Sequence, residues 1–280
     1  MRWAPALALA AALALPQGAV ERHSVPSPTL GGARTIRVYL PASYRKPGCE
    51  QRRYPVVYLL HGWPGSDGNW FGLGGAARSA DTLIAQGRVP ELILVCPNGN
   101  CGLIGRTMYM NALRGTCRME DYIAQDVVGW VDSTFRTIAT ASARGVLGLS
   151  DGGTGALNFA FRHPAVFGAA ASLSADLVLD PSEFGLGSMI RHGPDAEQRI
   201  AQFSPERAAA QRVGQLRTQV LYFDCGTSDE SLEENRSFHR TLVALGVPHA
   251  YQEFPGSHTW GYWRSHFRDA LLAITARMPR

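Results

Sequence analysis

The chain has 280 residues, of which 45% are hydrophobic and 18% charged, and its net charge is +4 at pH 7. This composition allows one large core and excludes a disordered chain. Lys46 is the single lysine and the arginines are scattered, so no basic stripe predicts a nucleic-acid partner.

Residues 1–19 have the pattern of a secretion signal. Arg2 precedes an apolar stretch, 4–15, that is too short to span a bilayer, and small residues follow it. We expect cleavage after Ala19, which leaves a mature protein of residues 20–280 without a membrane span, secreted or periplasmic. An N-terminal membrane anchor is the alternative interpretation.

Apolar runs typical of strands then alternate with segments typical of helices. The expected strands are 35–40, 56–60, 92–96, 145–149, 169–173, 220–223 and 250–254. The expected helices are 119–135, 230–245 and 263–278, with Thr227 or Ser228 capping the second and Gly246 ending it. This order predicts a single α/β domain, a mostly parallel central sheet with helices on both faces. The segment 176–213 interrupts the order and is a candidate small cap insertion, by analogy with such folds.

Five cysteines are compatible with an oxidising compartment. Cys101 and Cys117 flank one expected loop and are the favoured disulfide pair. Cys96 and Cys225 end apolar runs and are expected to be buried thiols, whereas Cys49 lies in a surface turn. No pair has the spacing of zinc ligands, so we expect no metal site, and the chemistry below requires no cofactor.

A serine in a glycine-rich turn is the main chemical signal. The run 148–153 contains the pattern Gly-x-Ser-x-Gly around Ser150, between a strand-like and a helix-like segment. That context is typical of a nucleophile on a sharp strand-to-helix turn, where flanking side chains would collide with the backbone. The alternative is a purely structural glycine turn.

A nucleophilic serine needs a base, and the base needs an orienting carboxylate. His258 follows the last expected strand, at the edge of the sheet where parallel α/β folds carry their active sites. Asp229 follows a Gly-Thr-Ser turn after the preceding strand and is the favoured acid. Asp224, inside that strand, and Glu230, at the start of a helix, are the alternatives.

Acyl transfer also needs two N–H groups that hold the negative oxygen. We expect them on Asp151, directly after the nucleophile, and on Trp63, which follows a strand and His61-Gly62. The Asp151 carboxylate would repel that oxygen, so its side chain must turn away into a hydrogen bond or salt bridge. His61 precedes the serine and is interpreted as shaping the loop. The aromatic residues that are candidates for a substrate pocket, beside His61, are Trp63, Trp70, Phe71, Tyr109, Trp260 and Trp263, and a place in the core is the alternative for each.

At these residues the chain resembles the esterase D-like family of α/β-hydrolases, which includes S-formylglutathione hydrolases, feruloyl, acetyl-xylan and siderophore esterases, and mycolyltransferases. The resemblance covers nearly all of the mature chain and lies in 37–41, 54–62, 148–150, 225–229, 254–260 and 262–263. It implies a triad of Ser150, Asp229 and His258, with oxyanion N–H groups on Trp63 and Asp151. Methionine is common in the family at the position of Asp151.

These observations predict a secreted serine esterase that acts on a small-molecule or polysaccharide-linked ester, of a carbohydrate or phenolic kind or a small carboxylic ester. The secretion signal argues against the cytosolic formylglutathione role. An acyltransferase with the same triad, and a binding protein on the same fold, are the alternatives. The sequence does not predict an oligomeric state.

Overall fold

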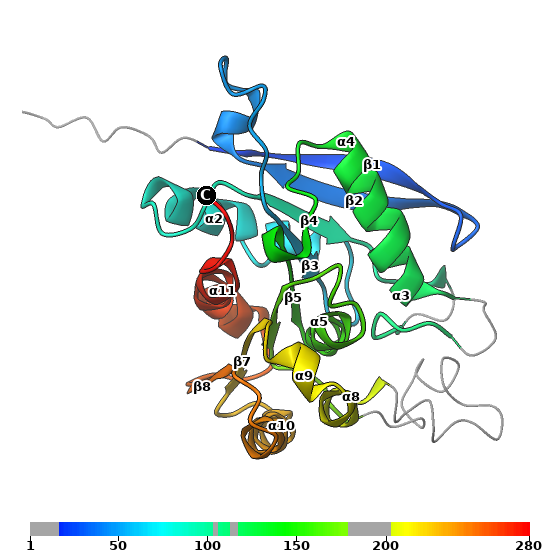
Figure 1. The fold of residues 1–280 in the computed structure, drawn as a ribbon, viewed down its shortest axis with the longest axis vertical. Coiled ribbons are helices and arrows are strands. Elements are labelled where there is room, and N and C mark those ends of the chain that lie inside the picture. The colour runs from blue at the N-terminus through cyan, green and yellow to red at the C-terminus, as the bar shows by residue number, and fades with distance from the viewer. Residues whose placement is uncertain (1–16, 103–105, 113–116, 179–202) are drawn as a thin grey trace, which may run out of the picture.

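The computed structural model describes residues 17–102, 106–112, 117–178 and 203–280. In this part of the chain an 8-stranded sheet has the order β1-β2-β4-β3-β5-β6-β7-β8 (Figure 1). The β1–β2 and β2–β4 pairs are antiparallel, and the remaining pairs are parallel. The strands are β1 Ala19–Ser27, β2 Gly32–Leu40, β3 Val56–Leu60, β4 Ile93–Pro97, β5 Arg144–Leu149, β6 Ala169–Leu173, β7 Val220–Gly226 and β8 Ala250–Phe254.

The sheet divides the core into two layers, because successive side chains of a strand point to opposite faces. On β3, Val56, Tyr58 and Leu60 pack into one hydrophobic cluster, and Val57 and Leu59 pack into the other. Both faces of this strand are therefore buried, which explains why it is apolar throughout instead of alternating with polar residues.

Helices cover both faces of the sheet (Figure 1). One face packs against the helices that follow β4, β5 and β7, and the other against α2 and the closing helix α11. The helices are α1 Asn69–Gly72, α2 Ala76–Ala85, α3 Met119–Asp121, the π-helical η3 Tyr122–Val127, α4 Val128–Thr134, α5 Asp151–Arg162, α8 Pro205–Gln211, α9 Val213–Leu216, α10 Leu232–Ala244 and α11 Trp260–Thr275, with short 3₁₀ turns at Ala42–Arg45 and Ala141–Ala143.

The expected strands 56–60, 169–173 and 250–254 have the predicted bounds, and four others differ by one to three residues at an end. The structure adds β1, which the sequence does not signal. β1 is an edge strand in which Val25 and Ser27 are the buried residues, so it lacks the apolar run of an inner strand.

Two expected helices begin elsewhere than predicted. The closing helix starts at Trp260, where the Thr259 hydroxyl accepts a hydrogen bond from the Tyr262 N–H, three residues before the expected 263. The helix α10 has Ser231 as its N-cap, without a side-chain cap, so the expected cap at Thr227 or Ser228 was wrong. Gly246 does follow the end of this helix, with a φ of 64°.

The predicted cap insertion and secretion signal lie largely outside the described residues. Within 176–213, the described residues include α8 and the first residue of α9, Val213, beside the non-helical residues 176–178. At the other end, β1 begins at Ala19, and the Gly18 N–H donates a hydrogen bond to the Asp81 carboxylate at 2.8 Å. Both assignments stay predictions.

The cysteines follow the expected pattern. Cys101 and Cys117 form a disulfide, Cys96 and Cys225 are buried free thiols, and Cys49 is half-buried. None of the helices in the described segments combines the length and apolar character that crossing a membrane demands.

Candidate active site

Ser150 occupies a strained turn between β5 and α5. Its φ of 53° and ψ of −126° are rare for a residue with a side chain, and they aim the hydroxyl out of the sheet edge. The flanking glycines are needed for contact reasons: a Cβ on Gly148 would lie 1.9 Å from the Gly152 carbonyl oxygen, and one on Gly152 would lie 2.3 Å from the Leu60 oxygen. The motif thus folds as its spacing predicts.

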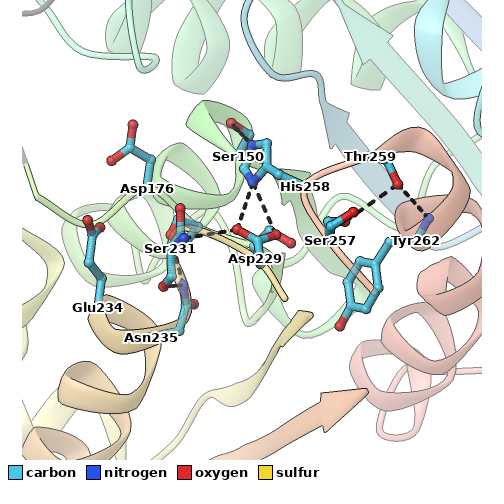
Figure 2. A network of polar contacts seen from close by, with 12 residues as sticks. Ser150, Asp176, Asp229, Ser231, Glu234, Asn235, Ser257, His258, Thr259 and Tyr262 are labelled. Atoms are coloured by element: carbon cyan, nitrogen blue, oxygen red, sulfur yellow. Dashed lines mark hydrogen bonds and ion pairs between the residues drawn. The ribbon is translucent and has the colours of Figure 1, made fainter. Parts of the chain in front are cut away.

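His258 and Asp229 lie beside this serine (Figure 2). The His258 Nε2 is 2.9 Å from the Ser150 Oγ, and its Nδ1 is 3.0 Å from the Asp229 Oδ1. The three side chains therefore form a continuous hydrogen-bonded chain from carboxylate to hydroxyl. In the sequence, His258 is 29 residues from Asp229 and 108 residues from Ser150.

Backbone hydrogen bonds between two loops fix this geometry. After β7, the Thr227 and Ser228 N–H groups donate to the oxygens of Phe254 and Gly256, each at 2.8 Å, in the segment that leads to His258. The loop that carries Asp229 is thus hydrogen-bonded to the loop that carries His258. These bonds at the edge of the sheet fix the distance between the carboxylate and the imidazole.

The charge of Asp229 acts on the histidine. Burial opposes a positive charge on His258, but the hydrogen bond and the negative charge of Asp229 outweigh burial and raise the pKa of His258. Burial likewise works against the Asp229 carboxylate, yet hydrogen bonds from His258, the Ser231 N–H and Ser174 hold its pKa below the usual value. Asp229 is therefore ionised at neutral pH.

The alternative acids do not reach the histidine ring. Asp224 is fully buried and accepts a hydrogen bond from the Tyr262 hydroxyl at 2.7 Å. Glu230 is exposed, and its carboxylate acts on His258 through charge. The structure thus brings Asp229, of the three candidates, into hydrogen-bond contact with the base.

The loop after β3 lies against the nucleophile. A Cβ on Gly62 would be 2.8 Å from the Leu149 Cδ1 and 3.0 Å from the Ser150 Cβ, so the backbone approaches closely here. Trp63 follows directly and lines the recess around Ser150. Asp151 is the first residue of α5, and its N–H therefore has no partner within the helix. Both residues therefore lie beside the nucleophile, and the oxyanion role of their N–H groups stays a prediction.

The Asp151 side chain turns away into a salt bridge, as its position requires. The Arg106 Nε lies 2.9 Å from its Oδ2 and the Nη2 lies 2.8 Å from its Oδ1, and the same Nη2 contacts Asp176. Burial raises the pKa of Asp151, and the guanidinium opposes that rise. The Asp151 carboxylate thus has a cationic partner.

Three candidate pocket residues have structural positions instead. His61 is buried, accepts a hydrogen bond from the Gly99 N–H at 2.9 Å and lies 2.8 Å from the Gly62 oxygen through Nδ1, which makes it a loop-shaping residue. Trp70 is fully buried and donates to the Leu60 oxygen, and Tyr109 donates to the His61 oxygen. Their assignment to a substrate pocket is corrected: each satisfies its polar group inside the core.

Trp260 and Trp263, by contrast, line the open recess at Ser150. This recess has a volume of about 430 Å³, and it is also lined by Gly62, Trp63, Pro64, Leu149 and Thr259. Among the described residues, no group of three or more His, Cys, Asp or Glu side chains is arranged to hold a metal ion.

Sequence reasoning missed three polar residues of the site. Arg106 and Asp176 come from loops outside the serine motif, and tertiary structure alone brings Arg106 into contact with both Asp151 and Asp176. Ser174 follows β6 with a φ of 49°, and its hydroxyl accepts a hydrogen bond from the Trp263 Nε1 at 3.2 Å. A short polar residue directly after an apolar strand was the one local signal that pointed to Ser174.

Comparisons with known proteins give one family. The model of the family named Esterase matches residues 27–274. A curated esterase of Mycobacterium tuberculosis is 28% identical over 275 residues, which covers 87% of this chain and 56% of that protein. An endo-1,4-beta-xylanase/feruloyl esterase of Xylanibacter ruminicola is 31% identical over 157 residues, 54% of this chain and 21% of that one. The chain thus spans about half or less of the length of these curated relatives.

Solved structures support the same fold. A ferulic acid esterase superposes with a TM-score of 0.83 at 26% identity, over 94% of this chain and 99% of that chain. A fluorophosphonate-binding serine hydrolase of Staphylococcus aureus superposes with a TM-score of 0.79 at 22% identity, over 92% and 99% of the two chains. The predicted α/β-hydrolase fold is confirmed.

Proposed function

The chain belongs to the Esterase family, and from this premise we propose that it is a secreted hydrolase of carboxylic esters with Ser150 as its nucleophile. The observation that carries the proposal is the unbroken hydrogen-bonded chain from Asp229 through His258 to Ser150, at the floor of an open recess. A binding protein would have no need of a strained serine held 2.9 Å from an imidazole.

The reaction has two acyl-transfer steps. The Ser150 Oγ attacks the ester carbonyl while its proton passes to the His258 Nε2, and Asp229 stabilises the resulting imidazolium. The N–H groups of Trp63 and Asp151 hold the negative oxygen of the tetrahedral intermediate. The alcohol leaves with the proton from His258. Water then attacks the acyl-enzyme and gives its proton to His258, and the acid is released as His258 returns this proton to the Ser150 Oγ.

A phenolic or carbohydrate ester is the substrate class that we propose. The recess of about 430 Å³ has tryptophan side chains on its wall, which suits a flat aromatic acid. A ferulic acid esterase has the same fold at 26% identity, and a relative carries the name feruloyl esterase. Both point to esters of hydroxycinnamic type.

The test is hydrolysis by the purified protein beside two serine variants. The substrates are methyl ferulate and p-nitrophenyl esters from acetate to palmitate. We expect turnover by the wild type and by Ser133→Ala, an exposed serine on α4, and none above background in Ser150→Ala. Equal rates in Ser150→Ala and the wild type would remove Ser150 as the nucleophile.

A second arm separates hydrolysis from acyl transfer. A sugar alcohol is added as acceptor, and the products are analysed by mass spectrometry. Free acid as the main product supports the hydrolase, whereas a new sugar ester that exceeds the free acid supports the acyltransferase with the same triad.

A further inference from the structure

Two recesses of different character meet at the reacting groups. The larger one, about 430 Å³, is the tryptophan-lined recess described above. The second, about 270 Å³, also borders Trp63, Ser150 and His258, but the other described residues of its wall are polar. We call it the charged recess, and these wall residues are Arg106, Asp151, Asp176, Glu230 and Ser231. Figure 2 shows Asp176 on one side of Ser150 and His258 and Thr259, a wall residue of the larger recess, on the other.

An ester whose carbonyl lies at Ser150 has two arms, and these arms leave the reacting carbon in different directions. Since both recesses border Ser150 and His258, each arm enters one of them. The apolar arm, an aromatic acyl group in the function proposed above, fits the tryptophan-lined recess. The alcohol arm then enters the charged recess.

The described wall of the charged recess is negative. The guanidinium of Arg106 in this wall is occupied by the carboxylates of Asp151 and Asp176, with the Nε and Nη2 both turned to Asp151. The exposed Glu230 adds a third carboxylate, so the described wall residues carry a net charge of minus two while His258 is neutral. The negative charges of Glu230 and Asp176 also help to raise the pKa of the His258 imidazole.

We propose that the charged recess selects the alcohol arm of the ester by charge: it accepts a neutral, hydroxyl-bearing alcohol and discriminates against an anionic one, with Glu230 as a specificity-determining residue. This inference rests on the proposed esterase function. Carboxylates accept hydrogen bonds from hydroxyl groups, so a glycerol or sugar hydroxyl gains contacts here. A carboxylate on the same arm meets like charge in a partly enclosed site, and Arg106 is already engaged.

Two substrates of nearly equal size separate charge from shape. They are the ferulic acid ester of glycerol and that of glyceric acid, in which a carboxylate replaces one hydroxymethyl group. The measured quantity is the ratio of kcat/KM for the glyceryl ester to that for the glycerate ester, in the wild type, in Glu230→Gln and in Glu233→Gln. Glu233 lies on α10 with 72% of its side chain exposed and outside both recesses, so it is the matched control.

We expect the wild type to prefer the glyceryl ester by about tenfold or more at low ionic strength, and Glu230→Gln to reduce this preference about three- to tenfold. We expect the ratio for Glu233→Gln to equal the wild-type value. In 0.5 M salt, where the screening length is on the order of 4 Å, the preference of the wild type should weaken. A change in the basicity of His258 acts on both esters alike, so the ratio reports the recess.

An unchanged ratio in Glu230→Gln, with both esters hydrolysed, would overturn the charge selection and leave the esterase standing. No hydrolysis of either ester or of methyl ferulate by the wild type would instead contradict the proposed function itself.

Discussion

At the scale of single residues, His258 experiences two opposing effects on its protonation. Burial favours the neutral ring, and the Asp229 carboxylate at 3.0 Å favours the charged ring and prevails, so the pKa lies above 6.5. The general base must be neutral to accept the Ser150 proton. We therefore expect kcat/KM to increase with pH through this raised pKa, so that the acid limb of a pH–rate profile lies above pH 6.5.

Asp229→Asn tests the source of this effect. The amide keeps the shape of the side chain but loses its charge and favours the wrong tautomer of the ring, so we expect kcat to decrease by about 10⁴-fold, as in other serine triads. The acid limb of the residual activity should move to lower pH, because the imidazolium has lost its counter-charge.

The matched control is Asp269→Asn, an exposed carboxylate that pairs with His266 on the surface of α11. It should leave both the rate and the limb unchanged. An acid limb at the wild-type position in Asp229→Asn would show that another group sets the protonation of His258.

Arg106 balances two carboxylates inside the site. Its side chain is 10% exposed and the Asp151 side chain 5%, so Arg106→Met leaves a buried charge without its partner. We expect a loss of about 3–5 kcal/mol in the free energy of unfolding, together with weaker turnover, because the Asp151 carboxylate then repels the oxyanion. Urea unfolding and kcat for methyl ferulate measure the two effects.

The double variant Arg106→Met/Asp151→Met removes the buried pair as a whole. We expect it to regain part of the stability and turnover lost in Arg106→Met, because the Asp151 carboxylate is gone and Asp176 alone lacks its partner. Arg118→Met, at an exposed pair with Asp121, should cost at most about 1 kcal/mol. A double variant as inactive as the single one would argue that Arg106 acts on catalysis by another route.

At the scale of secondary-structure elements, β7 and the loop that follows it carry two aspartates with different environments. The strand extends to Gly226, three residues past its predicted end. The prediction ended at Phe223 because the apolar run stops there, where the Asp224 carboxylate enters the core. Asp224 therefore lies within the sheet beside Tyr262, and Asp229 lies on the loop beyond it. The length of the strand past Phe223 was set by pairing with β6 and β8, which a single sequence does not display.

Asp224 makes stability depend on pH. Burial is the main cause that raises its pKa to about 7, against hydrogen bonds from Tyr262 and Tyr222. The folded state then binds the proton more tightly than the unfolded chain, whose aspartate titrates at about 3.9, so this contribution to stability is present below pH 4 and is lost as pH rises to 7.

We expect Asp224→Asn to be more stable than the wild type at pH 8, by about 2–4 kcal/mol, and nearly equal to it at pH 4, because asparagine keeps an acceptor for Tyr262 without the buried charge. Chemical unfolding at a series of pH values measures the difference. Glu253→Gln, on β8, should show a small change of opposite sign above pH 5, since Arg236 holds the pKa of that carboxyl below its usual value. Parallel curves for Asp224→Asn and the wild type would show that Asp224 titrates normally.

At the scale of the whole molecule, most of the sheet was predictable because inner parallel strands must be apolar on both faces. The main site residues were predictable for a related reason: they follow the carboxyl ends of β3, β5, β7 and β8, which meet at one edge. The charged recess was not predictable, because Arg106 contacts Asp151 and Asp176 from a separate loop, and loop contacts leave no periodic pattern in the sequence. Burial likewise places Trp70 and Tyr109 in the core instead of a substrate pocket. The sequence could not show this, because an aromatic residue gives the same sequence signal in a pocket and in a core.

The Cys101–Cys117 disulfide connects these scales. The bridge closes a loop with a sequence separation of 16, and that loop carries Arg106 to Asp151 and Tyr109 to the His61 oxygen. In the chain-entropy account, a cross-link over a loop of this length removes freedom from the unfolded chain and stabilises the fold by about 3 kcal/mol.

We expect Cys101→Ser/Cys117→Ser to lower the free energy of unfolding by about 2–4 kcal/mol and to weaken turnover more than stability alone explains, because Arg106 is then less firmly held against the Asp151 carboxylate. Guanidinium unfolding, and kcat measured well below the transition, separate the two effects. Cys49→Ser changes a half-buried free thiol and should leave both quantities near the wild type. If the double serine variant kept full kcat despite the lost stability, the bridge would support the fold alone, and the position of Arg106 would depend on its two carboxylate partners.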